Sequence, residues 1–131
     1  MPELAQLVVA PVEIRVPAVA ELSRVLRLAA SGVASLAQRT VDDIEDIKIA
    51  VSEVLLALIE HGVGGPIVIT LSFADETFLI TGRTEVVSFD IDHPDLVLCR
   101  TVLAGVCADH TINLTDGYVE IVAAIGGGVD G

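Results

Sequence analysis

The sequence predicts a two-layer α+β sandwich in which a mostly antiparallel sheet carries its helices on one face. Three observations lead to this fold class: short segments that alternate apolar and polar residues, two long segments with apolar residues every three or four positions, and short turns between consecutive predicted strands. Strands joined by short turns pair antiparallel, so the helices are left to cover one face. We expect a single domain over residues 1–131 that ends in a flexible tail at residues 126–131.

The first predicted strand and the first predicted helix lie within residues 12–38. Residues 12–16, VEIRV, alternate apolar and polar side chains, and Pro17 ends this strand. Residues 18–38 predict a helix because apolar side chains recur at helical spacing. Its expected buried stripe consists of Leu22, Val25, Leu26, Ala29, Val33 and Leu36.

A second helix is predicted over residues 41–61. Thr40 is a favourable N-cap, the acidic residues of the first turn suit the positive end of the helix dipole, and Gly62 is a natural stop. Its expected buried stripe consists of Ile44, Ile47, Val51, Val54, Leu55 and Leu58.

The second half of the chain predicts two hairpins with a helix between them. The elements, in order, are strands at 66–73 and 77–81, a candidate short strand at 85–89, a helix from Pro94 to about residue 108, and strands at 110–114 and 118–124. Proline suits the first position of a helix. The dipeptide Asp116-Gly117 between the last two strands is a strong hairpin signal.

Composition and charge exclude several classes of protein. With 7 Lys and Arg against 19 Asp and Glu, the formal net charge is −12, which argues against direct nucleic-acid binding. Charged residues interrupt every long apolar stretch, so we expect no membrane span despite a mean hydropathy of +0.73. The N-terminus does not have the pattern of a signal peptide, and we expect a cytoplasmic location.

Neither the cysteines nor the histidines form a recognisable site in the sequence. Cys99 and Cys107 both fall on the third predicted helix, where a rise of roughly 12 Å would separate them. That distance exceeds the Cα limit of a disulfide, so we expect two reduced core cysteines. The three histidines, His61, His93 and His110, lack metal-ligand spacing to one another or to a cysteine, so no metal site is predicted.

Residues 12–62 resemble the anti-sigma-factor serine kinases of the RsbW/SpoIIAB type. The resemblance rests on the order of the elements and on short matching segments, of which IEDIKIAVSE at residues 44–53 is the most specific. Beyond residue 62 it is one of topology only. It implies the Bergerat fold, the histidine-kinase-like fold of GHKL ATPases, and it implies a homodimer.

In that family the second helix carries the N-box, Glu-x-x-x-Asn, whose two side chains share one helix face. The Glu acts as general base or orients the attacking hydroxyl, and the Asn binds the magnesium ion that bridges the phosphates. Here Glu53 matches the Glu, whereas Ala57 stands at the Asn position, and a methyl group cannot ligate magnesium. His61 matches a histidine at the end of the family pattern.

The family's two glycine motifs are also missing from the second half of the chain. Where the resemblance predicts Asp-x-Gly-x-Gly, the sequence ITGRTE offers only Gly82 and no Asp. Where it predicts Gly-x-Gly before the last helix, the sequence has no glycine and carries Asp90, Asp92 and Asp95, which would repel a triphosphate. We therefore predict that Ala57, His61 and Gly82 mark the positions of a nucleotide site that no longer functions.

Several of these residues also have purely structural interpretations. Glu53 is either a relic base or a solvated helix residue, and the second is favoured because the magnesium ligand is missing. His61 suits the negative end of its helix. The three aspartates are better explained as capping the third helix than as a calcium loop, because the glycine and the terminal glutamate of an EF-hand are absent.

Together these observations predict an anti-sigma-factor-like regulator of transcription in a bacterial partner-switching system, a pseudokinase that acts by binding a protein. The expected partner is a sigma factor or an anti-sigma antagonist, and the expected cofactor is none. The alternative is an active serine/threonine kinase that uses ATP and magnesium to phosphorylate an anti-sigma-factor antagonist.

Overall fold

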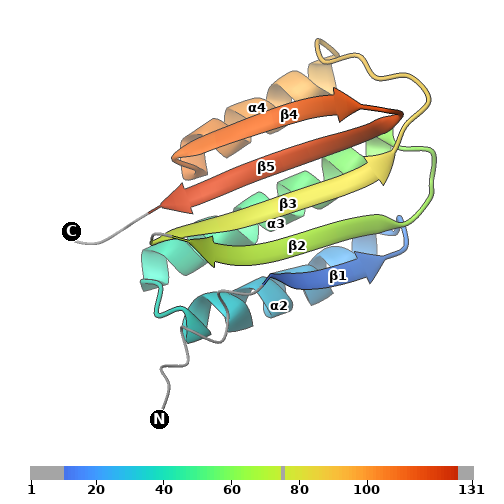
Figure 1. The fold of residues 1–131 in the computed structure, drawn as a ribbon. Coiled ribbons are helices and arrows are strands. Elements are labelled where there is room, and N and C mark those ends of the chain that lie inside the picture. The colour runs from blue at the N-terminus through green and yellow to red at the C-terminus, as the bar shows by residue number, and fades with distance from the viewer. Residues whose placement is uncertain (1–10, 75, 127–131) are drawn as a thin grey trace.

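The structure, a computed structural model, describes residues 11–74 and 76–126. The elements in these ranges are β1 (Val12–Val16), the short 3-10 helix η1 (Ala20–Leu22), α2 (Ser23–Leu36), α3 (Val41–His61), β2 (Ile67–Ala74), β3 (Thr77–Glu85), α4 (Pro94–Val106), β4 (Asp109–Thr115) and β5 (Tyr118–Gly126). The strands form one sheet in the order β1-β2-β3-β5-β4, and every pairing is antiparallel. The helices lie together behind one face of this sheet (Figure 1), so the predicted two-layer sandwich is confirmed.

Most predicted boundaries hold within two residues, but the start of the first helix and one strand are wrong. The helix predicted over residues 18–38 is α2, which begins at Ser23 after the short 3-10 helix η1. The candidate strand at residues 85–89 does not form: β3 runs from Thr77 to Glu85, past its predicted end at residue 81, and residues 86–89 are in no strand. β5 is the physical reason, because it pairs with β3 along its whole length, from Thr77 opposite Gly126 to Glu85 opposite Tyr118. The flexible tail was expected to begin at residue 126, yet Gly126 is the last residue of β5, and residues 127–131 lie outside the described part of the chain.

The core lies between the sheet and α3, the central helix. The inner face of the sheet and the inner face of α3 meet there with aliphatic side chains and Phe78. The predicted stripe of α3 is buried except for Ile44, which is half-buried. Burying this many apolar groups is the main source of stability in a domain of this size.

The predicted buried stripe of α2 is partly wrong. Leu26 and Val33 are buried, but Val25 and Leu36 are 49% and 41% exposed. Small residues face the core in their place: Ala30, Ala34 and Ala37 are buried. Alanine is less hydrophobic than valine or leucine. The predicted stripe therefore followed the larger side chains, some of which lie on a neighbouring, exposed face of the helix.

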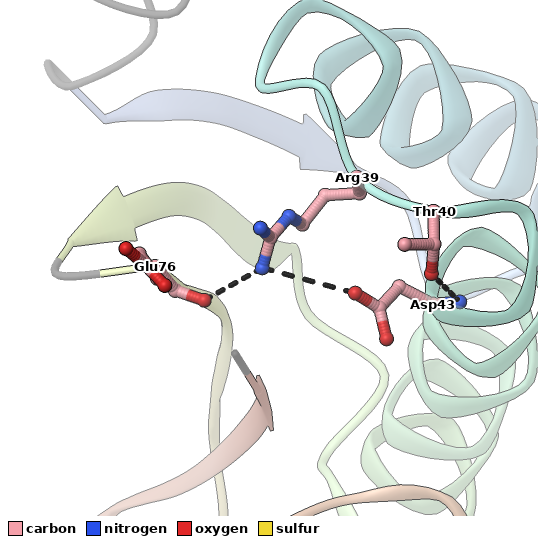
Figure 2. Close-up of polar contacts among 4 residues, drawn as sticks. All are labelled: Arg39, Thr40, Asp43 and Glu76. Atoms are coloured by element: carbon pink, nitrogen blue, oxygen red, sulfur yellow. Dashed lines mark hydrogen bonds and ion pairs between the residues drawn. The ribbon is translucent and has the colours of Figure 1, made fainter. Parts of the chain in front are cut away.

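A buried arginine ties the start of α3 to the β2–β3 turn (Figure 2). The Arg39 side chain is only 9% exposed, and its Nη1 donates to the backbone oxygen of Glu76 at 2.6 Å. The same atom lies 3.8 Å from Oδ2 of Asp43, and the guanidinium stands 5.0 Å from the centroid of the Phe73 ring. Thr40 caps the helix as predicted, its side chain accepting from the backbone N–H of Asp43 at 3.0 Å.

The last hairpin turns where the sequence predicts it. Asp116 and Gly117 have φ angles of 51° and 80°, and two successive positive φ values define the type I′ turn that suits the twist of paired strands.

Within the described residues, no helix combines the length and the apolar character that crossing a bilayer requires.

Both cysteines are free, as predicted, and their thiols should react slowly. Burial raises the pKa of Cys99 and of Cys107 from an ordinary 9.0 to about 11, with nearby carboxylates adding to the effect. At neutral pH the thiolate fraction is then roughly 100-fold smaller than for a free thiol. We expect iodoacetamide labelling to be slow at pH 8, to speed up about tenfold per pH unit towards pH 11, and to be fast in urea. Rapid labelling of the native chain at pH 7 would contradict this burial.

Candidate functional site

The positions predicted from the resemblance for the N-box and for the histidine that follows it lie on one side of α3. Glu53, Ala57 and His61 follow at steps of four residues, so they line up along the helix. The helix begins at the Thr40 cap and ends at His61, followed by Gly62. Gly62 itself has no room for a side chain, since an added Cβ would lie 2.7 Å from the backbone oxygen of Leu58.

Helix α4 runs antiparallel along this side of α3 and covers it. At one end of the contact the rings of His93 and His61 have centroids 5.0 Å apart. At the other end Sγ of Cys99 lies 3.9 Å from the backbone oxygen of Glu53. Ala57 lies between these two contacts and is 4% exposed. A ligand on the Ala57 face would therefore have to displace α4.

Glu53 is at the outer edge of the same helix side. It is half-buried, and burial together with the Glu60 carboxylate raises the pKa of its carboxyl group. It borders an open cavity of about 380 Å³ on the α2 side, lined by Arg27, Glu45, Lys48, Ile49, Ser52 and Glu53. This cavity includes none of the other positions predicted for the nucleotide site, so the structure does not gather Glu53, Ala57, His61 and Gly82 around one pocket there.

Gly82 is a packing residue in the middle of β3. It is buried and faces α3. An added Cβ would lie 2.5 Å from Cγ1 of Val54 and 2.7 Å from Cδ1 of Leu58. The glycine thus lets the strand approach the helix closely, which is sufficient reason for a glycine here without any nucleotide.

Asp90, Asp92 and Asp95 are exposed. The prediction that these aspartates cap α4 is wrong. The N-cap is His93, whose Nδ1 accepts from the backbone N–H of Asp95 at 3.1 Å. Asp95 is in the first turn, and Asp90 closes a small turn of its own by accepting from the backbone N–H of Asp92 at 3.0 Å. The correction has a simple cause: Pro94 must take the first helical position, so the residue before it becomes the cap.

Two of the histidines, which lack metal-ligand spacing in the sequence, lie side by side in the structure. His61 and His93 are 32 positions apart in sequence, yet they meet where the end of α3 faces the start of α4. Each of His61, His93 and Asp95 offers a ligand atom, and these three atoms lie within 4.8 Å of one another. Sequence spacing misses this cluster because two helices bring its members together. Only the antiparallel packing of those helices would have predicted it.

Comparison with known proteins supports the fold and shows similarity to RsbW proteins over part of the chain. No family model matches the chain. The chain is 37% identical over 83 residues to the serine-protein kinase RsbW of Halalkalibacterium halodurans, covering 62% of this chain and 51% of that protein. It is 54% identical over 50 residues to the serine-protein kinase RsbW of Staphylococcus aureus, covering 38% of this chain and 31% of that protein. The chain thus spans about half, or less, of the length of these relatives.

Among solved structures, the chain is similar to a Mycobacterium tuberculosis protein whose crystal structure contains RsbU and RsbW domains. The TM-score is 0.71 at 16% identity, and the match covers 89% of this chain and 32% of that one. The sheet order, the one-sided helices and this likeness define a two-layer domain of the histidine-kinase-like class. Over part of its length, the chain is similar to the RsbW serine-protein kinases.

Proposed function

We propose that this chain is a non-catalytic regulatory module of the RsbW type, a pseudokinase that acts by binding a protein partner in a bacterial partner-switching system. The observation that carries the proposal is Ala57. It replaces the family's magnesium-binding Asn and is 4% exposed beneath α4. Phosphoryl transfer depends on a metal ion to neutralise the phosphates, and an alanine cannot hold one.

Two other features support the same proposal. Gly82 is occupied in packing, and Asp90, Asp92 and Asp95 are exposed before and in the first turn of α4, where the family has phosphate-binding glycines. At neutral pH these carboxylates oppose a triphosphate by like-charge repulsion. Loss of the metal ligand, loss of the glycine backbone cradle and added negative charge all act against nucleotide binding.

A nucleotide titration tests the proposal. We expect calorimetry with ATP and magnesium to show no saturable binding at micromolar concentrations. We also expect Ala57→Asn to leave that result unchanged, because the side chain still lies beneath α4. Saturable, magnesium-dependent ATP binding by the unaltered chain would reject the pseudokinase.

One observation favours the alternative, an active serine/threonine kinase that phosphorylates an anti-sigma-factor antagonist. Glu53 is retained, and burial with the Glu60 charge raises its pKa, which is the direction expected of a general base. Transfer of labelled phosphate from ATP to an antagonist protein, abolished by Glu53→Gln, would establish this alternative. No transfer by either form is the outcome that the pseudokinase predicts.

The partner of the proposed module is a sigma factor or an anti-sigma antagonist, and the outer surface of α2 supports such a contact. Leu28 is 76% exposed there, and it lines an open cavity of about 370 Å³ with Arg24, Arg27, Ser31 and Lys48. This cavity thus gathers three of the seven basic residues of a strongly acidic chain around an exposed leucine. Such a patch fits an acidic segment of a partner with an apolar residue on it.

Aspartate substitutions at two exposed leucines test whether the partner binds at this patch or whether any new surface charge weakens binding. We expect Leu28→Asp to abolish co-purification with a purified candidate partner. Leu98→Asp is the matched control, because Leu98 is 64% exposed on α4 and should leave binding intact. Equal loss with both variants, or with neither, would place the contact elsewhere.

The proposed module is also expected to be a homodimer, as its family resemblance implies. The exposed apolar side chains of the helices give the expectation physical support, since such surfaces commonly mark interfaces. Light scattering should return twice the mass of the 13.7 kDa chain. A monomer at high protein concentration would remove this part of the proposal.

A further inference from the structure

The cluster of His61, His93 and Asp95 has the composition of a transition-metal site. Its three candidate ligand atoms lie within 4.8 Å of one another, and they come from the end of α3 and the first turn of α4. Two imidazoles and one carboxylate form a ligand set that zinc accepts and that magnesium, which prefers oxygen, does not. We propose that this cluster binds one zinc ion that joins α3 to the start of α4.

His61 carries the strongest indication that the cluster has a ligand. Its Nε2 is buried and makes no hydrogen bond to any residue in the described ranges. Buried polar atoms are nearly always paired, and an orphaned imidazole nitrogen beside a second imidazole and a carboxylate is satisfied by a metal ion. The surrounding ring contacts, with His93 and with Phe89 at a centroid distance of 5.9 Å, hold the imidazole in place.

The other two ligands are free to adjust. The side chains of His93 and Asp95 are 46% and 53% exposed, with Nδ1 of His93 lying 3.8 Å from Oδ2 of Asp95. Zinc holds nitrogen and oxygen ligands at about 2.0–2.2 Å, so drawing the three atoms around one ion needs shifts of about 1 Å. Three protein ligands leave the fourth tetrahedral position for solvent or for a partner's side chain.

Binding would exchange one hydrogen bond for the metal bond. Nδ1 of His93 now accepts from the backbone N–H of Asp95, so Nε2 of the neutral ring carries the proton. A zinc ion on Nδ1 takes the place of that N–H directly. A zinc ion on Nε2 moves the proton to Nδ1 and ends the same bond. Either way the N-cap hydrogen bond is lost, which a metal bond outweighs.

The local charges favour a cation on balance. The C-terminal end of α3, at His61, is the negative end of a long helix, whereas the start of α4 is the positive end of a shorter one. The carboxylate of Asp95 adds negative charge to the cluster, and the exposed Asp90 and Asp92 lie only a few residues before His93. These aspartates, unfavourable for a phosphate, are favourable for a metal ion.

Calorimetry of the full chain, freed of metal with a chelator and titrated with zinc chloride, tests the proposal. We expect one zinc per chain and an affinity that excess magnesium leaves unchanged. His93→Asn should weaken binding by more than about 100-fold, because even outer-shell partners of a metal site carry 10–100-fold. This variant keeps a side-chain acceptor for the helix cap, so the fold is preserved. Asp95→Asn should weaken binding as well.

Two further variants make the outcome decisive. His61→Phe keeps a ring beside Phe89 but has no ligand atom, and it should also lose zinc. His110→Gln alters the third histidine of the chain, which lies outside the cluster on β4, and it should bind like the unaltered chain. Zinc should raise the melting temperature of the unaltered chain and of the His110 variant only. Absence of zinc binding, equal binding by the His93 variant, or displacement by magnesium would each overturn the proposal.

Discussion

Replacing Arg39 with alanine should destabilise the domain by about 3 kcal/mol, the low end of the cost of breaking a buried ion pair. The side chain is 9% exposed, and its loss leaves the Asp43 carboxylate, 12% exposed, without a counter-charge. It also removes the 2.6 Å hydrogen bond to the backbone oxygen of Glu76 and the contact with the Phe73 ring. Urea unfolding followed by circular dichroism would measure the change in the free energy of unfolding.

Two companion variants show whether the cost comes from the buried charge. Arg24→Ala removes an exposed arginine from α2 and should change stability by less than about 0.5 kcal/mol. The double variant Arg39→Ala/Asp43→Ala should cost less than the sum of the two single changes, since it removes both charges. Additive effects would mean that the two side chains do not interact, and the interpretation of Figure 2 as an ion pair would fail.

Gly82→Ala should cost about 2 kcal/mol, within the range for overpacking a well-packed core. The new methyl group would lie 2.5 Å from Cγ1 of Val54 and 2.7 Å from Cδ1 of Leu58, and 3.2 Å from Cδ1 of Ile69. Because these neighbours belong to both α3 and β2, the helix and the sheet would have to move apart. The midpoint of urea unfolding is the measurement, with an unchanged slope expected for a native state that stays compact.

Gly105 provides the matched control for this change. It lies in α4 with no described atom within 4 Å of an added Cβ, so Gly105→Ala should instead stabilise the domain by about 0.5–1 kcal/mol. The two substitutions are chemically identical and are expected to have opposite signs. A stabilising Gly82→Ala would show that the helix does not press on β3 as the structure has it.

The fold was largely predictable because its elements have strong local signals. The Thr40 cap and the Gly62 stop place α3 correctly, and Asp116-Gly117 places the last hairpin. The errors arise where a distant partner decides. β3 extends to Glu85 because β5 pairs with it, and the buried face of α2 shifts to its alanines because α3 packs closely there.

The sequence names candidate residues for the site, but it does not predict how the fold arranges them. The family resemblance predicts that Ala57 stands where a magnesium ligand would be, and an alanine methyl group cannot ligate a metal ion. The sequence does not show that Gly82 faces the core, which depends on which side of β3 meets α3. Nor does it show that His61 lies beside His93, because only the packing of α4 against α3 brings two such distant residues together.

The packing of α4 over Ala57 has a consequence for how the proposed module would transmit a signal. A kinase marks its target covalently, and the mark outlasts the encounter until another enzyme removes it. A module that only binds its partner, without using ATP, leaves no covalent modification after the complex dissociates. Its output at any moment is set by the concentrations of the partners and their dissociation constants, and it relaxes as fast as the complexes dissociate. In such a circuit, the amounts of the partner proteins would set the output, in place of a phosphorylated state.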